Sequence, residues 1–202
     1  MARNKELNQK IKHERREQIL SKALMLYATK GLAATKITDI SEAAGISQGL
    51  FYHYYSSKDE IFIEIISNGF AMLNEACRWL EKQPLSPKEK IVFAVKELLK
   101  LLEDNEDAAR YHLLIAQATA SEAIPDEAKE IIKRENNYPY EAIERIVIEG
   151  QKDGSIKAYD SKELALVFWT TINGLAIYKA VHGKKFKAPN ENIITSIFIR
   201  ND

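Results

Sequence analysis

Apolar residues recur along most of this 202-residue chain at the three- and four-residue spacing of an amphipathic helix. No stretch shows the strict alternation that is typical of a half-buried strand, and no internal repeat occurs. The predicted fold class is therefore all-α, with about nine helices. The expected helices are 14–30, 36–44, 48–54, 58–82, 88–102, 107–120, 125–153, 162–182 and 190–200.

Glycine, proline and capping residues set the expected ends of these helices. Gly31 is expected to end the first helix in a left-handed conformation, and Thr35 to cap the second. Ser86 precedes Pro87 as a cap precedes the first helical position. Pro139 is expected to kink one long helix rather than to divide it.

Residues 40–51 have the pattern of a helix-turn-helix. Two short helices that cross steeply need a small residue in the first helix, here Ser41, and a glycine in the turn, here Gly45. The faces that pack together must be apolar. The positions that satisfy this requirement are Ile40, Ala44, Ile46, Phe51 and Tyr54.

Around this motif the sequence resembles the TetR family of bacterial regulators, over about residues 18–65. Ser41 replaces the usual alanine and Tyr55 the usual phenylalanine, and both keep the size class. The resemblance implies a DNA-binding domain at residues 1–60 and a variable effector-binding and dimerisation domain at residues 61–202. The matching positions are Ala23, Tyr27, Gly31, Thr35, Ile37, Asp39-Ile40, Ala44-Gly45-Ile46-Ser47, Gly49, Tyr52, Tyr54-Tyr55, Lys58 and Ile61.

The second helix of the motif is expected to enter the major groove of DNA. Gln48 suits a bidentate pair with adenine, and Thr38 and His53 are further candidates for reading sequence. Ordinary surface roles stay open for all three, as does packing of Tyr52 on Phe51. The full predicted set of DNA contacts is Thr35, Lys36, Thr38, Ser47, Gln48, Gly49, Tyr52, His53 and Lys58.

The distribution of charge gives weak support to DNA binding by the N-terminal residues. Residues 1–60 hold ten basic and seven acidic side chains, a net +3 that is balanced by −3 in the remainder. Such a distribution fits attraction to phosphates, and equally an ordinary scatter of solvated charges. Four basic residues near the N-terminus fit either an arm that contacts DNA or a mobile, solvated tail, and both interpretations stay open. The four residues are Lys10, Lys12, Arg15 and Arg16.

The helix at 162–182 is apolar on most sides and must be covered on most sides. It is either a core helix of the monomer or, as the resemblance implies, part of a four-helix bundle formed with the last helix across the two-fold axis of a homodimer. The second reading is the expectation. Its interface residues are Leu164, Phe168, Leu175, Ile194, Ile197 and Phe198.

The resemblance also implies a pocket in the body for a small hydrophobic effector. Such sites have apolar walls with a few polar groups. The candidates are His112, Gln117, Trp169 and Asn173, although aromatic residues at helical spacing are usually core. Effector binding is expected to shift the population away from the DNA-binding conformer, through the helix that begins at Lys58.

Other protein classes find little support. The chain has no hydrolase, phosphate-loop or dinucleotide motif, and its four histidines lack metal-ligand spacing, so neither catalysis, cofactor nor metal is expected. Cys77, the single cysteine, excludes an intramolecular disulfide. The N-terminus is polar, and no apolar run approaches the roughly 20 residues of a membrane span, which predicts a cytoplasmic protein.

The expected function is a ligand-responsive repressor that binds a near-palindromic operator as a homodimer. Two alternatives stay open, a DNA-binding regulator without a small effector and an activator. The sequence identifies neither the effector nor the operator.

Overall fold

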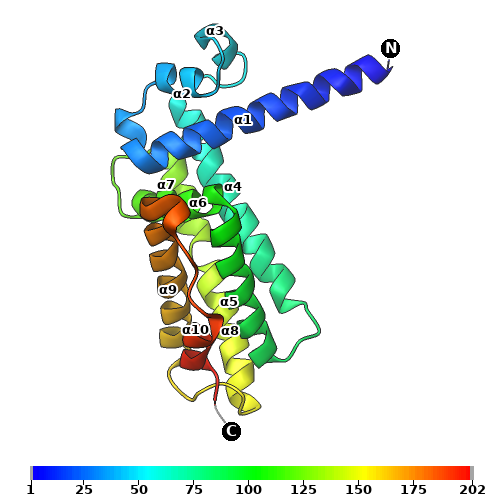
Figure 1. Ribbon diagram of the computed structural model, residues 1–202, viewed down its shortest axis with the longest axis vertical. Helices are drawn as coiled ribbons and strands as arrows, with labels where there is room; N and C mark the ends of the chain where they lie inside the picture. Colours follow the sequence, from blue (N-terminus) through cyan, green and yellow to red (C-terminus); the bar gives the residue numbers. More distant parts are fainter. Residues whose placement is uncertain (1, 201–202) are drawn as a thin grey trace.

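The computed structural model describes residues 2–200, which form ten α-helices and one 3₁₀ turn (Figure 1). Ile156 and Ile199 add one isolated antiparallel bridge. The predicted all-α class is confirmed. The elements are α1 (Ala2–Ala34), α2 (Ile37–Ala43), α3 (Gln48–Phe51), α4 (Lys58–Glu81), α5 (Pro87–Asp104), α6 (Glu106–Thr119), α7 (Asp126–Glu135), α8 (Tyr138–Lys152), α9 (Ser161–His182), η1 (Gly183–Lys185) and α10 (Glu191–Phe198).

The helices divide into a head and an elongated body. α1, α2 and α3 lie at one end, and the first half of α1 projects sideways away from the rest of the molecule (Figure 1). α4, α5, α8 and α9 run along the long axis, and the C-terminus lies at the end opposite the head. α3 is thus held at the tip of the molecule, far from the C-terminal end of the body.

Two apolar cores hold this arrangement together. The first joins α1, α2, α3 and the start of α4 to α6 and α7, around Tyr27, Phe51 and Ile61. The second joins the rest of α4 to α5, α8, α9 and α10, around Phe168 and Phe198. Because α4 contributes to both cores, the boundary expected at residue 60 falls inside a continuous helix and stays a prediction.

The ends of the first two helices follow the sequence only in part. Gly31 has a φ of +80° where the helical path of α1 is interrupted, as expected for a residue without a Cβ. The capping role of Thr35 is wrong, because Lys36 occupies the N-cap of α2 and its backbone N–H donates to the Asp39 carboxylate at 3.2 Å. The Thr35 hydroxyl instead donates to the Gly31 carbonyl at 2.7 Å.

The single helix expected at residues 125–153 is two helices. α7 ends at Glu135, and α8 begins at Tyr138 with Pro139 in its first turn. A proline lacks the N–H that a helix interior needs but fits the first turn, where no intrahelical bond is made. The residue therefore starts a second helix instead of kinking one, and the helix count rises from nine to ten.

Four of the six expected dimer contacts lie inside the monomer. Leu164, Phe168, Ile194 and Phe198 are each at most 4% exposed, and the rings of Phe168 and Phe198 meet edge to face. α9 packs on α6 and α8, and α10 packs on α5, which covers these side chains. This part of the interface prediction is corrected, since the residues have no surface left for a partner. The remaining two are half-buried Leu175 and exposed Ile197.

The expectation that no apolar run approaches membrane-spanning length is wrong. Residues Ser161–Lys185 are long and apolar enough to cross a membrane, by length and composition alone. α9 nevertheless packs on α6 and α8, and the core helix of a folded domain passes the same test. The second core accounts for the buried part of this run, while Leu166, Ile177 and Val181 are exposed.

Replacing Phe168 tests whether it is core. Phe168→Ala is expected to lower the free energy of unfolding by about 3–5 kcal/mol, because it removes a fully buried ring and leaves a cavity. Lys162→Ala on the exposed start of the same helix is the control and should change it by less than about 0.5 kcal/mol. Denaturant unfolding gives both values, and equal small effects would contradict the core assignment.

Candidate functional site

The turn between α2 and α3 is fixed by local chemistry. Gly45 has a φ of +63°, and the Ile46 N–H donates to the Ser41 carbonyl at 3.0 Å. From α1, the Gln18 side-chain amide donates to the Ala44 carbonyl at 3.2 Å. The steep crossing of α2 and α3 is therefore held by its own backbone and by α1 behind it.

α3 presents its polar side outward. Phe51 is fully buried and anchors the helix, while the Ser47 hydroxyl caps it by accepting the Leu50 N–H at 3.1 Å. Tyr52 touches Phe51 edge to face and is still 56% exposed, so its hydroxyl stays available to DNA. The exposed residues in and around α3 are Ser47, Gln48, Gly49, Leu50, Tyr52 and His53.

Leu50 is an addition that the sequence reasoning missed. It is 36% exposed on α3, two positions after Gln48. An apolar side chain at such a place can contact the methyl group of thymine. The available signal was its position inside the predicted reading helix, on the face away from buried Phe51.

Two residues that were predicted to contact phosphate, Thr35 and Lys58, have other roles in the fold. Thr35 is fully buried. The Lys58 ammonium donates to three backbone carbonyls at the end of α1, those of Leu32 at 2.9 Å, Ala33 at 3.3 Å and Thr35 at 3.1 Å. An ammonium has three donors, so Lys58 caps α1 and has none left for a phosphate. Exposed Lys36 and half-buried Thr38 remain beside α3 as candidates.

Arg16 is a structural residue rather than part of an arm. Its guanidinium donates to the Tyr55 hydroxyl at 3.1 Å and to the Glu64 carboxylate at 2.6 Å, and lies over the Tyr55 ring. These hydrogen bonds raise the pKa of Arg16. The contacts tie α1 to the segment after α3 and to α4. Lys10 and Lys12 lie exposed on the projecting part of α1.

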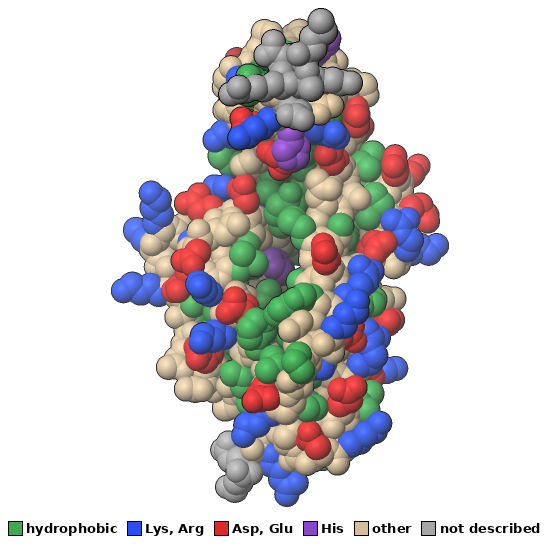
Figure 2. Space-filling view, turned by 90° about the vertical axis from the view of Figure 1, so that its right-hand side faces the viewer, with side chains coloured by type: hydrophobic (Ala, Val, Ile, Leu, Met, Phe, Trp, Pro, Cys, Tyr) green, Lys and Arg blue, Asp and Glu red, His purple; other side chains and the backbone are tan. Residues whose placement is uncertain are grey.

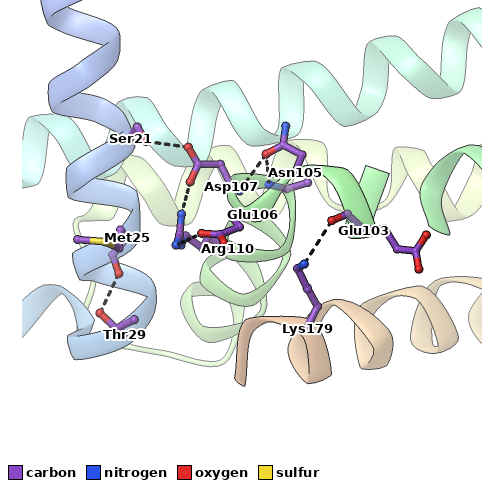
Figure 3. Close-up of polar contacts among 10 residues, drawn as sticks. Ser21, Met25, Thr29, Glu103, Asn105, Glu106, Asp107, Arg110 and Lys179 are labelled. Atoms are coloured by element: carbon purple, nitrogen blue, oxygen red, sulfur yellow. Dashed lines mark hydrogen bonds and ion pairs between the residues drawn. The ribbon is translucent and has the colours of Figure 1, made fainter. Parts of the chain in front are cut away.

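α6 is also attached to α1, as Figure 3 shows. The Ser21 hydroxyl donates to the Asp107 carboxylate at 2.7 Å, and Arg110 donates to the other oxygen of Asp107 at 2.6 Å. Arg110 also pairs with Glu106 at 2.9 Å, and the Asn105 side chain caps the helix. The first turn of α6 is thereby fixed against the helix that supports the turn between α2 and α3.

A pocket of about 310 Å³, here called the body cavity, lies among α4, α6, α8 and α9. Three predicted effector contacts, His112, Trp169 and Asn173, line it. Gln117 does not, because it faces outward into a groove beside the end of α1, and that prediction is corrected. The lining residues are Gly69, Phe70, Leu73, Tyr111, His112, Ile115, Ala116, Thr119, Ala120, Asn136, Pro139, Tyr140, Trp169 and Asn173.

The polar groups of the body cavity are uncharged. Nδ1 of His112 lies 2.8 Å from Oδ1 of Asn173, and burial lowers the pKa of His112. Burial raises the pKa of Tyr111 to about 12 and also raises that of Tyr140. The Trp169 indole N–H donates to the Pro139 carbonyl at 2.9 Å, which fixes that wall.

Gly69 brings α4 and α6 close together at the body cavity. A Cβ at this position would lie 3.0 Å from side-chain carbons of both Tyr111 and Ile115. Sequence reasoning missed Gly69, Thr119 and Asn136 as cavity residues. For Gly69 the signal was a glycine in the middle of a predicted long helix, where it has a packing reason.

A second cavity of about 350 Å³ lies between α4 and α5 and shares Leu73 and Trp169 with the first. On the side of the molecule that Figure 2 draws, hydrophobic side chains form a hollowed strip between charged ones. The lining of the second cavity is apolar except for Glu97. The lining residues are Leu73, Ala76, Cys77, Trp79, Leu80, Phe93, Ala94, Glu97, Leu98, Leu101, Ile143, Phe168 and Trp169.

The described residues give little support for metal binding or for thiol chemistry. Within residues 2–200, no three His, Cys, Asp or Glu side chains are grouped so that they could hold a metal ion. Cys77 is buried, and that burial raises the pKa of its thiol to about 12. A thiol of that pKa stays protonated at neutral pH and is a poor nucleophile.

Residues 19–65 match the family model described as bacterial regulatory proteins, tetR family. The matched span covers α2, α3 and the parts of α1 and α4 that pack on them. These residues carry the DNA-binding motif of the TetR family. The resemblance stated on the residues is thus confirmed over this span, which includes the exposed surface around α3.

Relatives of this chain are named as regulators of transcription. The transcriptional repressor KstR2 of Rhodococcus jostii is 28% identical over 157 residues, which span 78% of this chain and 75% of that protein. The alignment extends well beyond the DNA-binding motif into the body.

Solved structures share the whole fold. The ketosteroid regulator KstR2 of Mycobacterium tuberculosis superposes with a TM-score of 0.75 at 19% identity, covering 93% of this chain and 96% of that one. AibR, solved with isovaleryl coenzyme A and operator DNA, superposes with a TM-score of 0.68 at 16% identity, covering 90% and 94%. At these identities the likeness establishes the fold alone.

The buried His112 predicts a pH dependence of stability. Its folded pKa lies below the value of about 6.5 for an unfolded histidine, so below that pH the unfolded chain binds a proton that the folded chain lacks. The free energy of unfolding should therefore fall as pH drops from about 7.5 to about 5.5. Urea titrations should find a weaker dependence in His112→Gln; an identical slope would rule this contribution out.

Proposed function

We propose that this TetR-family regulator is a repressor that binds a near-palindromic operator as a homodimer and is released by a small hydrophobic effector. The observation that carries the proposal is the exposed surface around α3, held outward at the tip of the molecule by the buried ring of Phe51. A second copy and a ligand are each supported by a separate feature of the body.

The exposed residues around α3 have the chemistry to read a major groove. Gln48 can form a bidentate pair with adenine, and Gly49 lets the backbone come close to the DNA. Tyr52 and Lys36 can reach phosphates, which set the register of the protein on the duplex. We keep Thr38, Ser47 and His53 as further contacts and add Leu50, while Thr35 and Lys58 leave the set.

The proposed dimer uses a stripe on α9 and two residues of α10. Val181 of α9 is 71% exposed and Ile193 of α10 is 65% exposed. Such strong exposure of several aliphatic side chains on two helices is unusual for a monomer. Gly174 has open space where a Cβ would point, so a helix from a second copy can approach there. The proposed interface residues are Leu166, Thr170, Gly174, Ile177, Tyr178 and Val181 of α9, with Ile193 and Ile197 of α10.

A two-fold axis also serves recognition. α3 is only four residues long, and a single copy reads few base pairs. Two copies on one axis read two half-sites about one helical turn apart, which raises selectivity. The proposal therefore links the apolar stripe on α9 to the specificity of DNA binding.

The proposed effector site is the body cavity. Its size is within the range of about 300–1,000 Å³ that is usual for small-molecule sites. Tyr111, His112 and Ile115 on its wall belong to α6, whose first turn holds Ser21 of α1 through Asp107. A ligand that moves α6 or α4 would move α1, and binding that favours one conformer shifts the population toward it.

One structural neighbour lends support to this pairing of sites. AibR was solved with both isovaleryl coenzyme A and operator DNA. A protein of this fold can thus engage a small molecule and an operator. For the present chain the ligand-responsive repressor is proposed on that precedent and on its own cavity, exposed α3 and apolar stripe.

Replacing Gln48 tests the reading role. Gln48→Ala should weaken binding to an operator selected from random sequence by about tenfold or more, because a bidentate base contact is worth roughly 1–3 kcal/mol. Binding to a scrambled duplex should change little. Glu75→Ala on the exposed side of α4 is the control. Fluorescence anisotropy at fixed salt measures the affinities of the wild type and both variants for the two duplexes, and equal losses on both duplexes would remove Gln48 from sequence reading.

Replacing Val181 tests the dimer. The wild type should sediment as a dimer at micromolar concentration, and Val181→Glu should sediment as a monomer because a charge buried in an apolar interface has no partner. Met72→Glu is the matched control, an exposed apolar residue on α4 that lies off the stripe. A monomeric wild type, or a Val181→Glu dimer, would refute the interface.

A further inference from the structure

Resting on the proposed function, we infer that the body cavity takes an uncharged, largely apolar molecule that carries a hydroxyl group, an alcohol or a phenol, and rejects the corresponding carboxylate. Three separate features lead to this class of ligand. They are the polar groups of the cavity wall, the absence of charge among its lining residues and the apolar space beside it. Neither the sequence motif nor the relatives specify it.

Charge decides against an anion. No Lys, Arg, Asp or Glu is among the fourteen residues that line the body cavity. A carboxylate or phosphate inside it would lose its hydration without gaining a cation, which costs several kcal/mol. In the second cavity the charged lining residue is Glu97, whose own carboxylate would repel another. Both spaces therefore favour an uncharged ligand.

The arrangement of His112 leaves an acceptor free. Its Nδ1 faces Oδ1 of Asn173 at 2.8 Å, and an amide oxygen has no hydrogen, so Nδ1 carries the proton. In the neutral ring Nε2 then holds a lone pair. Within residues 2–200, Nε2 makes no hydrogen bond, and the ring lies in the cavity wall. A ligand that contacts this nitrogen must supply a hydrogen-bond donor.

Asn173 also leaves donors free, on the Nδ1 side of the His112 ring. With Oδ1 accepting from His112, its side-chain N–H₂ has no partner among the residues that the structure describes. A hydroxyl of the ligand can donate to Nε2 of His112, whereas the amide of Asn173, on the Nδ1 side of the ring, would have to donate to a different acceptor. An ether or a carbonyl can only accept, which would leave Nε2 of His112 unpaired.

The rest of the ligand has apolar space to fill. Phe70, Leu73, Ile115 and Trp169 form much of the remaining wall of the body cavity. Leu73 and Trp169 also line the second cavity, so a molecule too long for the first has an apolar continuation across those two side chains. An amphipathic alcohol with an extended hydrocarbon part matches both spaces.

A first experiment reads the histidine directly, without ligand or DNA. Protein labelled with ¹⁵N-histidine should give a side-chain ¹H–¹⁵N correlation of the Nδ1–H tautomer, assigned to His112 by its loss in His112→Phe. Saturating 1-octanol should then move the Nε2 resonance as that atom accepts a hydrogen bond. An Nε2–H tautomer, or an unmoved Nε2 resonance, would overturn the inference.

A second experiment compares three probes of equal chain length by calorimetry. 1-Octanol should bind the wild type about tenfold tighter than octyl methyl ether, the effect of one buried acceptor left unpaired, and tighter still than octanoate. His112→Phe should abolish the difference between alcohol and ether. His13→Gln, an exposed histidine outside the cavity, is the matched control and should keep it. Octanoate or ether binding as tightly as octanol, or no octanol binding up to its solubility, would overturn the inference.

Operator release separates this inference from the function on which it rests. If octanol binds with the expected preference but leaves operator affinity unchanged, the hydroxyl-binding site stands and the release mechanism falls. If octanoate releases the operator from both the wild type and His112→Phe, the repressor stands and the hydroxyl inference falls.

Discussion

The fold depends on the packing of α1 against two partners at once. α1 supports the turn between α2 and α3 through Gln18, and it holds the first turn of α6 through Ser21 and Asp107. Tyr27 adds a hydrogen bond from its hydroxyl to the Lys58 carbonyl at 2.7 Å, where α4 begins. The head therefore shares the first core with the start of α4 and with α6 and α7.

Because of this shared core, a ligand in the proposed effector site would contact helices that also pack against the head. Its walls include Gly69 of α4 and Tyr111 of α6, which meet where a glycine permits close approach. Both helices reach the head, α4 through Lys58 and α6 through Asp107. Packed interfaces of this kind have few alternative arrangements, so the proposed effector would act by shifting whole helices.

The head could be predicted from the sequence because its turn and cap depend on neighbouring residues. The body was harder to predict because its structure depends on contacts between residues far apart in the chain. Gly45 and Ser47 act through their own turn and cap, and both were read correctly from the sequence. Lys58 was misread because its carbonyl partners lie at the end of α1, 23 to 26 positions earlier in the chain. α9 is apolar all round, so the sequence could not show that Phe168 faces the core and Val181 the surface.

The central claim is that the surface around α3 enters two major grooves on one face of a duplex. Hydroxyl-radical footprinting on a selected operator tests it most directly. The account predicts two protected segments, related by the symmetry of the site and centred about one helical turn or 10 base pairs apart. A single protected segment, or no protection on any duplex at low salt, would contradict it.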